Sequence, residues 1–278
     1  MHKMNQEAGR AARVSDTLLK ADDISIVFGG LRAVSNFSSE LKHGELVGLI
    51  GPNGAGKTTV FNMLSGIYKP TEGVISFTDR HGKENFIQGK KPHYLSKTGI
   101  ARTFQNIRLF GNLTVEENVL IAMHNQYSAN PLEVVFRTPH FYRSEGELHD
   151  RAGSFLELFH IESKSSELAK NLPYGEQRKL EIARALATNP LLLLLDEPAA
   201  GMNPQETQEL MEHIKFIRKK FNLTILLIEH DMKLVMGVCE RLIVLDYGRI
   251  IAAGLPHEIQ KNPAVIKAYL GEEALIDA

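Results

Sequence analysis

Several common features are scarce in this sequence of 278 residues. It has one cysteine, Cys239, so no internal disulfide is possible, which fits a reducing compartment. The 32 Lys and Arg residues balance 33 Asp and Glu residues, so the formal net charge is −1 and no basic excess favours nucleic acid as a partner. No apolar run approaches the roughly 20 residues of a membrane-spanning helix. If the protein acts at a membrane, we expect another subunit to cross it.

The remaining pattern is that of a soluble α/β protein with 43% hydrophobic residues. Residues 1–16 are polar, and we expect a flexible tail rather than a signal peptide. Two alternating stretches, 18–28 and 31–41, flank a Gly-Gly pair and predict an antiparallel hairpin. Short strands are predicted near 45–50, 69–77, 190–198 and 223–231, a helix at 204–221 and a hairpin at 241–254.

The middle of the chain is predicted to be helical. "TVEENVLIAMHNQ" begins with a capping box, 146–161 has helical periodicity, and 127–143 is expected to be irregular and rich in aromatics. The pattern therefore predicts one domain over 17–271, with an α/β core (17–104 and 188–255), an antiparallel β subdomain, a helical insertion (105–187) and a C-terminal helical tail (256–278).

A glycine-rich loop follows the predicted strand 45–50. "GPNGAGKT" matches the phosphate-binding loop pattern, in which backbone N–H groups surround a phosphate, a lysine reaches its oxygens and a hydroxyl binds Mg²⁺. A glycine turn with an incidental lysine is the alternative, but a strand leads in and a helix leads out, as phosphate binding requires. The predicted nucleotide-binding residues are Gly51, Pro52, Asn53, Gly54, Ala55, Gly56, Lys57, Thr58 and Thr59, with Lys57 also assisting catalysis and Thr58 binding Mg²⁺.

Four more residues are candidates for the same site. Asp196, ending the strand "LLLLLD", is predicted to hold Mg²⁺, and the following Glu197 to orient or deprotonate an attacking water. His230, at the tip of the next strand, is a candidate γ-phosphate sensor rather than a structural histidine, and Gln105 is placed to touch Mg²⁺ and the water. The alternative is that Asp196 and Glu197 are two solvated acids at a strand end, that His230 is a structural histidine and that Gln105 is a surface amide.

Phe28, which precedes the first glycine pair, is a candidate platform for an adenine ring. Its alternative is an ordinary core residue.

The order and spacing of these motifs resemble the ATP-binding cassette (ABC) ATPases over residues 17–271. The resemblance implies a P-loop NTPase (RecA-like) core, the cofactors ATP and Mg²⁺, and ATP hydrolysis. "LPYGEQ" (172–177), here termed the signature turn, stands where that family has LSGGQ. In the family this turn caps a helix whose N-terminus faces ATP on the other subunit of a head-to-tail pair. Tyr174, Gly175 and Glu176 would therefore hold a neighbour's nucleotide.

Two positions depart from the family pattern. Pro173 replaces a serine and supplies neither a hydroxyl nor an N–H, although proline suits the start of a helix. We hypothesise that the site completed by this turn binds ATP more loosely than its mate. Asn203 stands where the family usually has aspartate.

Several stretches resemble one branch of the family. "GIARTFQNIRLFGNLTVEENVLIAMH", 127–143, "YGEQRKLEIARAL" and "NPAVIKAYLG" are similar to an ATPase subunit of bacterial branched-chain amino acid importers. This implies a peripheral protein at the cytoplasmic face of the inner membrane, with a second and related ATPase, two permease subunits and an external binding protein. Ile107, Leu109 and Phe110 are expected to form a groove for a permease helix, the alternative being ordinary core residues.

Other functions remain possible on the sequence. The same ATPase could serve urea, short amides or lipopolysaccharide export, since the permease selects the cargo. Non-transport cassettes usually carry two cassettes, zinc cysteines or coiled coils, none of which is seen. A simple P-loop kinase would not need the signature turn, and no acceptor site is recognisable.

Overall fold

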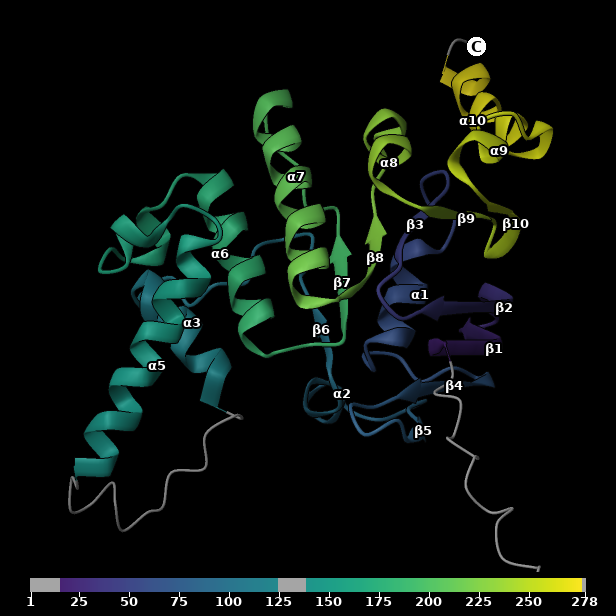
Figure 1. Cartoon of the computed structure of the whole chain (residues 1–278). Coiled ribbons are helices and arrows are strands. Elements are labelled where there is room, and N and C mark those ends of the chain that lie inside the picture. Colours follow the sequence, from purple (N-terminus) through teal and green to yellow (C-terminus); the bar gives the residue numbers. More distant parts are fainter. Residues whose placement is uncertain (1–15, 125–138, 277–278) are drawn as a thin grey trace, which may run out of the picture.

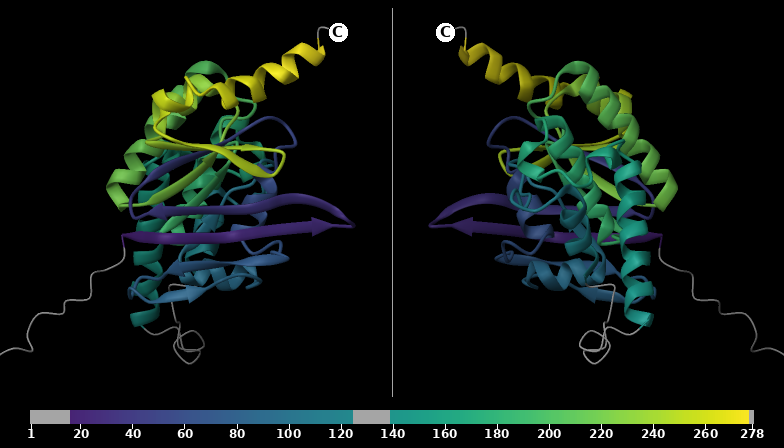
Figure 2. Two further views of the ribbon diagram at one scale, coloured as in Figure 1. Left: turned by 90° about the vertical axis from the view of Figure 1, so that its right-hand side faces the viewer. Right: turned by 90° about the vertical axis from the view of Figure 1, so that its left-hand side faces the viewer.

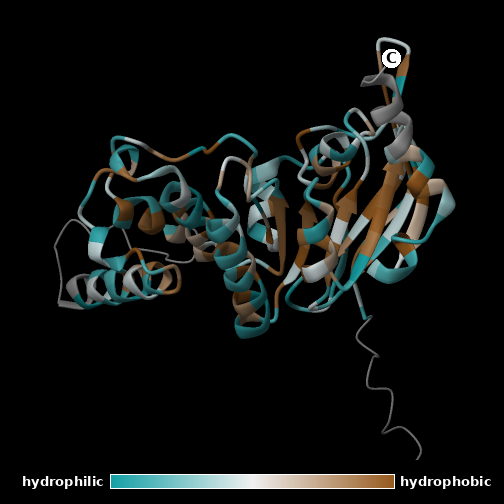
Figure 3. Ribbon diagram, turned by 90° about the horizontal axis from the view of Figure 1, so that it is seen from above, coloured by the Kyte–Doolittle hydropathy of each residue, from teal (hydrophilic) through white to brown (hydrophobic). Residues whose placement is uncertain are grey.

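The structure, a computed structural model, describes residues 16–124 and 139–276. Three groups of elements lie side by side in Figure 1. Helices α3 (Val115–Met123), α5 (Pro139–Glu157) and α6 (Tyr174–Ala187) lie on one side, a six-stranded sheet in the middle and a four-stranded sheet on the other side. Seen from above in Figure 3, the central strands are hydrophobic and the outer surfaces of the surrounding helices are largely hydrophilic. The arrangement is the α/β class that the sequence predicts.

The six-stranded sheet has the order β10-β9-β3-β8-β7-β6. Its parallel strands are β6 (Ile100–Arg102), β7 (Leu192–Asp196), β8 (Thr224–Ile228), β3 (Leu46–Ile50) and β9 (Arg241–Asp246), and β10 (Arg249–Gly254) runs antiparallel to β9. Every residue of β3, β7 and β8 is buried. Continuous apolar runs suit parallel strands because both faces of such a sheet are covered.

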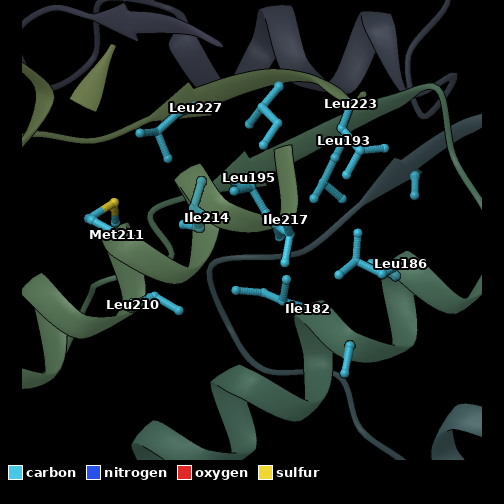
Figure 4. Close-up of a cluster of buried hydrophobic side chains, with 14 of the residues drawn as sticks. Ile182, Leu186, Leu193, Leu195, Leu210, Met211, Ile214, Ile217, Leu223 and Leu227 are labelled. Carbon is cyan, nitrogen blue, oxygen red and sulfur yellow. The ribbon is translucent and has the colours of Figure 1, made fainter. Parts of the chain in front are cut away.

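The two faces of this sheet belong to two cores, because successive side chains of a strand point to opposite faces. Leu193 and Leu195 of β7 pack with α6 (Tyr174–Ala187) and α7 (Pro204–Phe221), as Figure 4 shows. Leu192 and Leu194 face the other way, toward α1 (Lys57–Leu64) and the four-stranded sheet. Helix α1 is therefore fixed between the two sheets.

The four-stranded antiparallel sheet has the order β2-β1-β4-β5. The strands are β1 (Thr17–Phe28), β2 (Leu31–Lys42), β4 (Glu72–Thr78) and β5 (Glu84–Phe86). The predicted hairpin is confirmed, since β1 and β2 pair antiparallel across Gly29 and Gly30. Both views of Figure 2 show this long hairpin crossing the molecule, and helix α10 (Pro263–Ile276) extending from the upper edge of the molecule.

The other helices are short or amphipathic. They are α2 (Pro92–Thr98), α3 (Val115–Met123), α5 (Pro139–Glu157), α8 (Met232–Val238), α9 (Pro256–Ile259) and α10 (Pro263–Ile276), with 3-10 turns at Glu162–Lys164 and Ala169–Asn171. The predicted capping box is present at α3, where Thr114 and Glu117 each accept a backbone N–H from the other. Helix α7 has the predicted bounds.

One predicted segment needs correction. We expected 127–143 to be irregular, but α5 already begins at Pro139, where the proline can occupy the first turn without losing a hydrogen bond. Residues 127–138 of that segment, and residues 1–15 of the predicted tail, lie outside the described residues. Among the residues that the structure does describe, no helix is both long and apolar enough to cross a bilayer.

Candidate functional site

The fold brings three predicted motifs to one edge of the sheet. Strands β3, β7 and β8 are adjacent and parallel, so the loops that follow them lie next to one another. These loops carry the glycine-rich loop 51–58, Asp196 with Glu197, and His230. Open parallel sheets bind ligands at this carboxyl edge. The site is therefore built from segments that are up to 180 residues apart in sequence but share one edge.

The glycine-rich loop has the shape that its sequence predicts. Gly51, Gly54 and Gly56 have φ values of 148°, 77° and 100°, which side-chain-bearing residues rarely adopt. A β-carbon at Gly51 would lie 2.1 Å from the carbonyl oxygen of Leu245, so no larger residue fits there. Lys57 begins α1 with its amine buried and donates to the carbonyl oxygens of Gly51 and Pro52, at 2.7 and 2.8 Å. The loop thus curls around its own lysine.

Glu197 lies at the centre of the remaining candidates. The Gln105 side-chain amide donates to its carboxylate at 2.8 Å, and Nδ1 of His230 lies 4.0 Å from the same oxygen. Glu197 itself has a φ of 47°, an uncommon value for a residue with a side chain. Its N–H donates to the carbonyl of Ile228, so the neighbouring strand holds this conformation. Three of the four predicted catalytic side chains, Glu197, Gln105 and His230, therefore lie close together.

Asp196 has a partner that sequence reasoning missed. Nη2 of Arg102 donates to its carboxylate at 2.8 Å, and both side chains are buried. Nη1 of the same arginine donates to Asn62 on α1 and to Ser65 directly after it, at 2.7 and 2.8 Å. The pair ties the end of β7 to the helix that follows the phosphate-binding loop. A charged residue that ends the apolar stretch "GIAR" was the available signal.

Glu229 is a second residue that the sequence did not single out. Its side chain is buried beside His230 and accepts the N–H of Ala199 at 2.9 Å, in the loop that follows Glu197. Burial raises the pKa of the Glu229 carboxyl, although the hydrogen bond from Ala199 opposes that shift. This side chain positions the 199–203 loop rather than facing solvent.

Phe28 lies at the end of β1, and its ring is 41% exposed. It meets Tyr68 edge to face, with 5.2 Å between ring centroids. Tyr68 packs against one part of the ring and another part is exposed, and the stacking of Phe28 on an adenine ring stays a prediction.

The signature turn opens α6. Pro173 is the residue before the helix and provides no side-chain cap, and the first N–H groups of a helix have no partner within it. The Tyr174 ring is 45% exposed, and Lys164 donates to both carboxylate oxygens of Glu176, at 2.7 and 2.6 Å. Helix N-termini with free N–H groups attract anions.

Arg178, one turn along α6, is the largest fully buried side chain of the described residues. It forms an ion pair of 2.8 Å with Glu181, whose side chain is also buried. Burial raises the pKa of the Glu181 carboxyl, and the neighbouring Arg178 charge opposes this. Two charges three residues apart on the buried face of a helix were the signal in "RKLE" that sequence reasoning passed over.

The residues present fit Mg²⁺ bound together with a nucleotide. The structure describes no cluster of three or more His, Cys, Asp or Glu side chains suited to a metal. The predicted ligands are instead one hydroxyl (Thr58), one amide (Gln105) and one carboxylate (Asp196). Mg²⁺ prefers such oxygen ligands and typically takes the rest from substrate phosphates and water.

A groove of about 660 Å³ is lined in part by Phe104 and Arg108, which flank Gln105 in the sequence. Leu109 and Phe110 line it together with Ile67, Leu95, Ile121 and Arg184, whereas Ile107 is not among its lining residues. Phe110 is 50% exposed, and its backbone is held by Asn118, which accepts its N–H and donates to its carbonyl.

The sequence matches a known family. The family described as "ABC transporter" covers residues 34–200, more than half of the chain. The chain belongs to the ABC transporter family. A second family, "Branched-chain amino acid ATP-binding cassette transporter", matches residues 249–274. The chain is an ABC ATPase, and the structure carries the P-loop architecture of that class.

Relatives of this ABC cassette match along nearly all of their length. The high-affinity branched-chain amino acid transport ATP-binding protein LivG of Salmonella typhimurium is 50% identical over 93% of this chain and 100% of its own. The corresponding protein BraF of Pseudomonas aeruginosa is 46% identical, with the same coverage. The lipopolysaccharide export system ATP-binding protein LptB of Escherichia coli is 35% identical over 92% of this chain and 98% of its own.

Solved structures of ABC cassettes are similar as well. The crystal structure of the ADP conformation of MJ1267, an ATP-binding cassette of an ABC transporter, has a TM-score of 0.77 and 31% identity. It covers 92% of this chain and 99% of the other.

Proposed function

We propose that this ABC cassette hydrolyses ATP to power the import of branched-chain amino acids. The observation that carries the proposal is the identity of about half the residues to LivG and BraF along their full lengths. The match of residues 249–274 to a family named for the same cargo supports it. We further propose that the protein works at the cytoplasmic face of the inner membrane, with a second ATPase, two permeases and an external binding protein.

ATP binding is assigned to the glycine-rich loop and its surroundings. The N–H groups of the loop would surround the phosphates, Lys57 would exchange its carbonyl partners for phosphate oxygens, and Phe28 would stack on the adenine. Thr58, Gln105 and Asp196 would hold Mg²⁺, which when bound neutralises charge on the phosphates. The concave backbone and the buried lysine support this assignment.

Hydrolysis is assigned to Glu197 together with Gln105 and His230. Glu197 would orient and deprotonate the attacking water, and Gln105 fixes the direction of its carboxylate through the 2.8 Å hydrogen bond. His230, whose side chain is 65% exposed at the end of β8, would face the γ-phosphate. Their meeting at the sheet edge supports these roles.

The signature turn would complete a second ATP site. In a head-to-tail pair, the N–H groups of Tyr174, Gly175 and Glu176 would face ATP bound to the partner. Likeness to the family favours a related subunit over a second copy as the partner. In such a pair, the missing hydroxyl at Pro173 would make the site completed here the looser of the two.

The permease contact is assigned to the groove of about 660 Å³. Its lining is mostly apolar, and the half-exposed Phe110 ring lies with the Arg184 guanidinium 5.7 Å from its centroid. An amphipathic helix fits such a groove through side chains spaced one turn apart.

Uptake in native cells tests the cargo. Labelled leucine and labelled urea are supplied separately at low concentration to cells carrying the intact gene or Lys57→Ala at matched expression. We expect Lys57→Ala to abolish leucine uptake because the loop loses its only lysine, and to leave urea uptake unchanged. Lipopolysaccharide export is the second candidate function, because the identity to LptB is lower than the identity to LivG and BraF.

Uptake and ATP hydrolysis, measured separately, distinguish a wrong cargo from a wrong assignment of the ATPase activity. Normal leucine uptake in Lys57→Ala cells, with purified intact protein still hydrolysing ATP, would reject branched-chain amino acids and leave urea, amides or lipopolysaccharide. Lys57→Arg serves as a control for charge, since a guanidinium does not fit the place where the amine donates to Gly51 and Pro52.

A further inference from the structure

Arg178 contacts two separate functional segments at once. Nη1 donates to the carbonyl oxygen of Phe104 at 2.6 Å, and Nη2 to that of Gln105 at 2.7 Å. Nη2 also donates to the hydroxyl of Tyr174 in the signature turn, at 3.2 Å. One guanidinium therefore holds the backbone at Gln105 and the first residue of α6.

Glu181 ties the same segment from the other side. Its Oε1 accepts the N–H groups of Arg108 at 3.3 Å and Phe104 at 3.5 Å, while its Oε2 accepts from Arg178. The Gln105 segment, defined as residues 104–108, is thus bonded to α6 through both carbonyl oxygens and N–H groups. Because both side chains are buried, no water replaces a broken bond, and separating the segment from α6 is costly.

The signature turn also packs on the loop that follows Glu197. Gly201 has a φ of 78°, and a β-carbon there would lie 3.2 Å from the Tyr174 ring. A β-carbon at Gly175 would lie 3.4 Å from both Met202 and Glu206. The N-terminus of α6 therefore touches the chain a few residues beyond Glu197.

These contacts form a continuous path to Glu197. From Tyr174 the path passes through the Arg178 guanidinium to the Gln105 carbonyl, and then through the Gln105 side chain to the Glu197 carboxylate. Each link is a hydrogen bond of 3.2 Å or less. A displacement at the start of α6 would therefore move the amide that fixes Glu197.

We infer that Arg178 is a positioning residue that makes α6 and the Gln105 segment move as one body, and so transmits occupancy at the signature turn to Glu197. This inference rests on the proposed head-to-tail pairing, in which the signature turn faces the partner's ATP. Each ATP site would then control the attacking-water residue of the other. The planar guanidinium suits this role because it donates to four oxygens at once, which an ammonium cannot reproduce.

The test compares Arg178→Lys with the intact protein in the assembled transporter, measuring ATP hydrolysis against ATP concentration. We expect a sigmoidal dependence in the intact protein to become hyperbolic in Arg178→Lys, and kcat to fall at least about fivefold, the lower end of typical couplings between sites. Binding of MgADP to the purified chain should be unchanged, because Arg178 makes none of its hydrogen bonds to the phosphate-binding loop. Arg218→Lys, which alters a pairing with Glu240, is the matched control and should keep the sigmoidal curve.

Retention of the sigmoidal curve by folded Arg178→Lys, even with a lower melting temperature, would reduce Arg178 to a structural role and overturn the inference. A hyperbolic curve in the intact protein would overturn it too, while absence of any hydrolysis would instead reject the proposed function. If Arg178→Lys does not fold, Tyr174→Phe decides, since it removes only the hydroxyl that Arg178 contacts. A loss of sigmoidality there supports the path, and an unchanged curve rejects it.

Discussion

Glu197 combines an uncommon backbone conformation with a directed carboxylate. Its φ of 47° and its N–H bond to Ile228 turn the chain sharply at the end of β7. Backbone conformations of this kind cost free energy and persist where the surroundings hold them, often at functional sites. The turn brings the carboxylate to the Gln105 amide rather than into line with the strand.

Glu197→Gln tests the assignment of this residue as the general base. The amide has the shape of the carboxylate but cannot take a proton at neutral pH, so we expect ATP hydrolysis to fall by about 10²- to 10⁴-fold. Nucleotide binding should persist, and ATP should hold the ATPase pair together long enough to isolate it by gel filtration.

Glu212→Gln is the control, since it removes a carboxylate from the exposed face of α7. It should hydrolyse ATP at the normal rate. Turnover near normal in Glu197→Gln would remove Glu197 as the base and direct attention to His230.

At the residue scale, the sequence predicted groups that belong to local patterns. The phosphate-binding loop, Asp196 with Glu197, and His230 each follow a buried strand, and parallel strands bring such ends together. Arg102 and Glu229 were missed because their partners are distant in sequence: Arg102 pairs with Asp196, and Glu229 accepts from Ala199. For Arg178 the local pair with Glu181 was visible, but its bond to the carbonyl of Gln105 was not. Such pairs exist only once the elements have packed.

Helix α7 shows what a local pattern can predict at the scale of an element. Its predicted bounds are confirmed, because Asn203 and Pro204 signal its start and the sequence near Phe221 leads into a new strand. The start of α5 was predicted wrongly, because aromatic and proline residues in 127–143 obscured the helical period. In this protein, the start of α7, which carries a capping box, was predicted correctly, and the start of α5 was not.

Asn203 tests the cap of α7. Its side chain accepts the N–H of Glu206 at 2.9 Å, and Glu206 accepts the Asn203 N–H at 3.0 Å. Asn203→Ala should lower the free energy of unfolding by about 1 kcal/mol in urea titration. Asn203→Asp keeps the acceptor and adds a negative charge at the helix N-terminus, so it should be at least as stable as the intact protein.

The control for this cap is Gln205→Ala, on the exposed face of the same helix, where only a side-chain bond to Glu209 is lost. Its free energy of unfolding should change by less than about 0.5 kcal/mol. If Asn203→Ala changed stability no more than Gln205→Ala, the capping box would contribute nothing measurable.

On the scale of the whole molecule, the two faces of the Gln105 segment point to different partners. Gln105 contacts Glu197 at the proposed ATP site, whereas Phe104 and Arg108 of the same segment line the groove. Because α6 is bonded to this segment through Arg178 and Glu181, a ligand in either proposed site would act on the same group of residues. The proposed permease contact and the proposed ATP site are thereby neighbours along one short stretch of chain.

Phe110→Asp tests the permease contact at this scale. The half-exposed ring would be replaced by a carboxylate, which cannot pack against the apolar face of a permease helix, so we expect the protein to leave the membrane fraction and leucine uptake to be lost. Phe216→Asp is the matched control, since that ring is 51% exposed on α7, away from the groove, and should leave both unchanged. ATP binding by the purified Phe110→Asp chain should persist, because its backbone bonds to Asn118 do not involve the ring. Membrane association and uptake equal to those of Phe216→Asp would show that the permease binds elsewhere, even if the ATP site works as proposed.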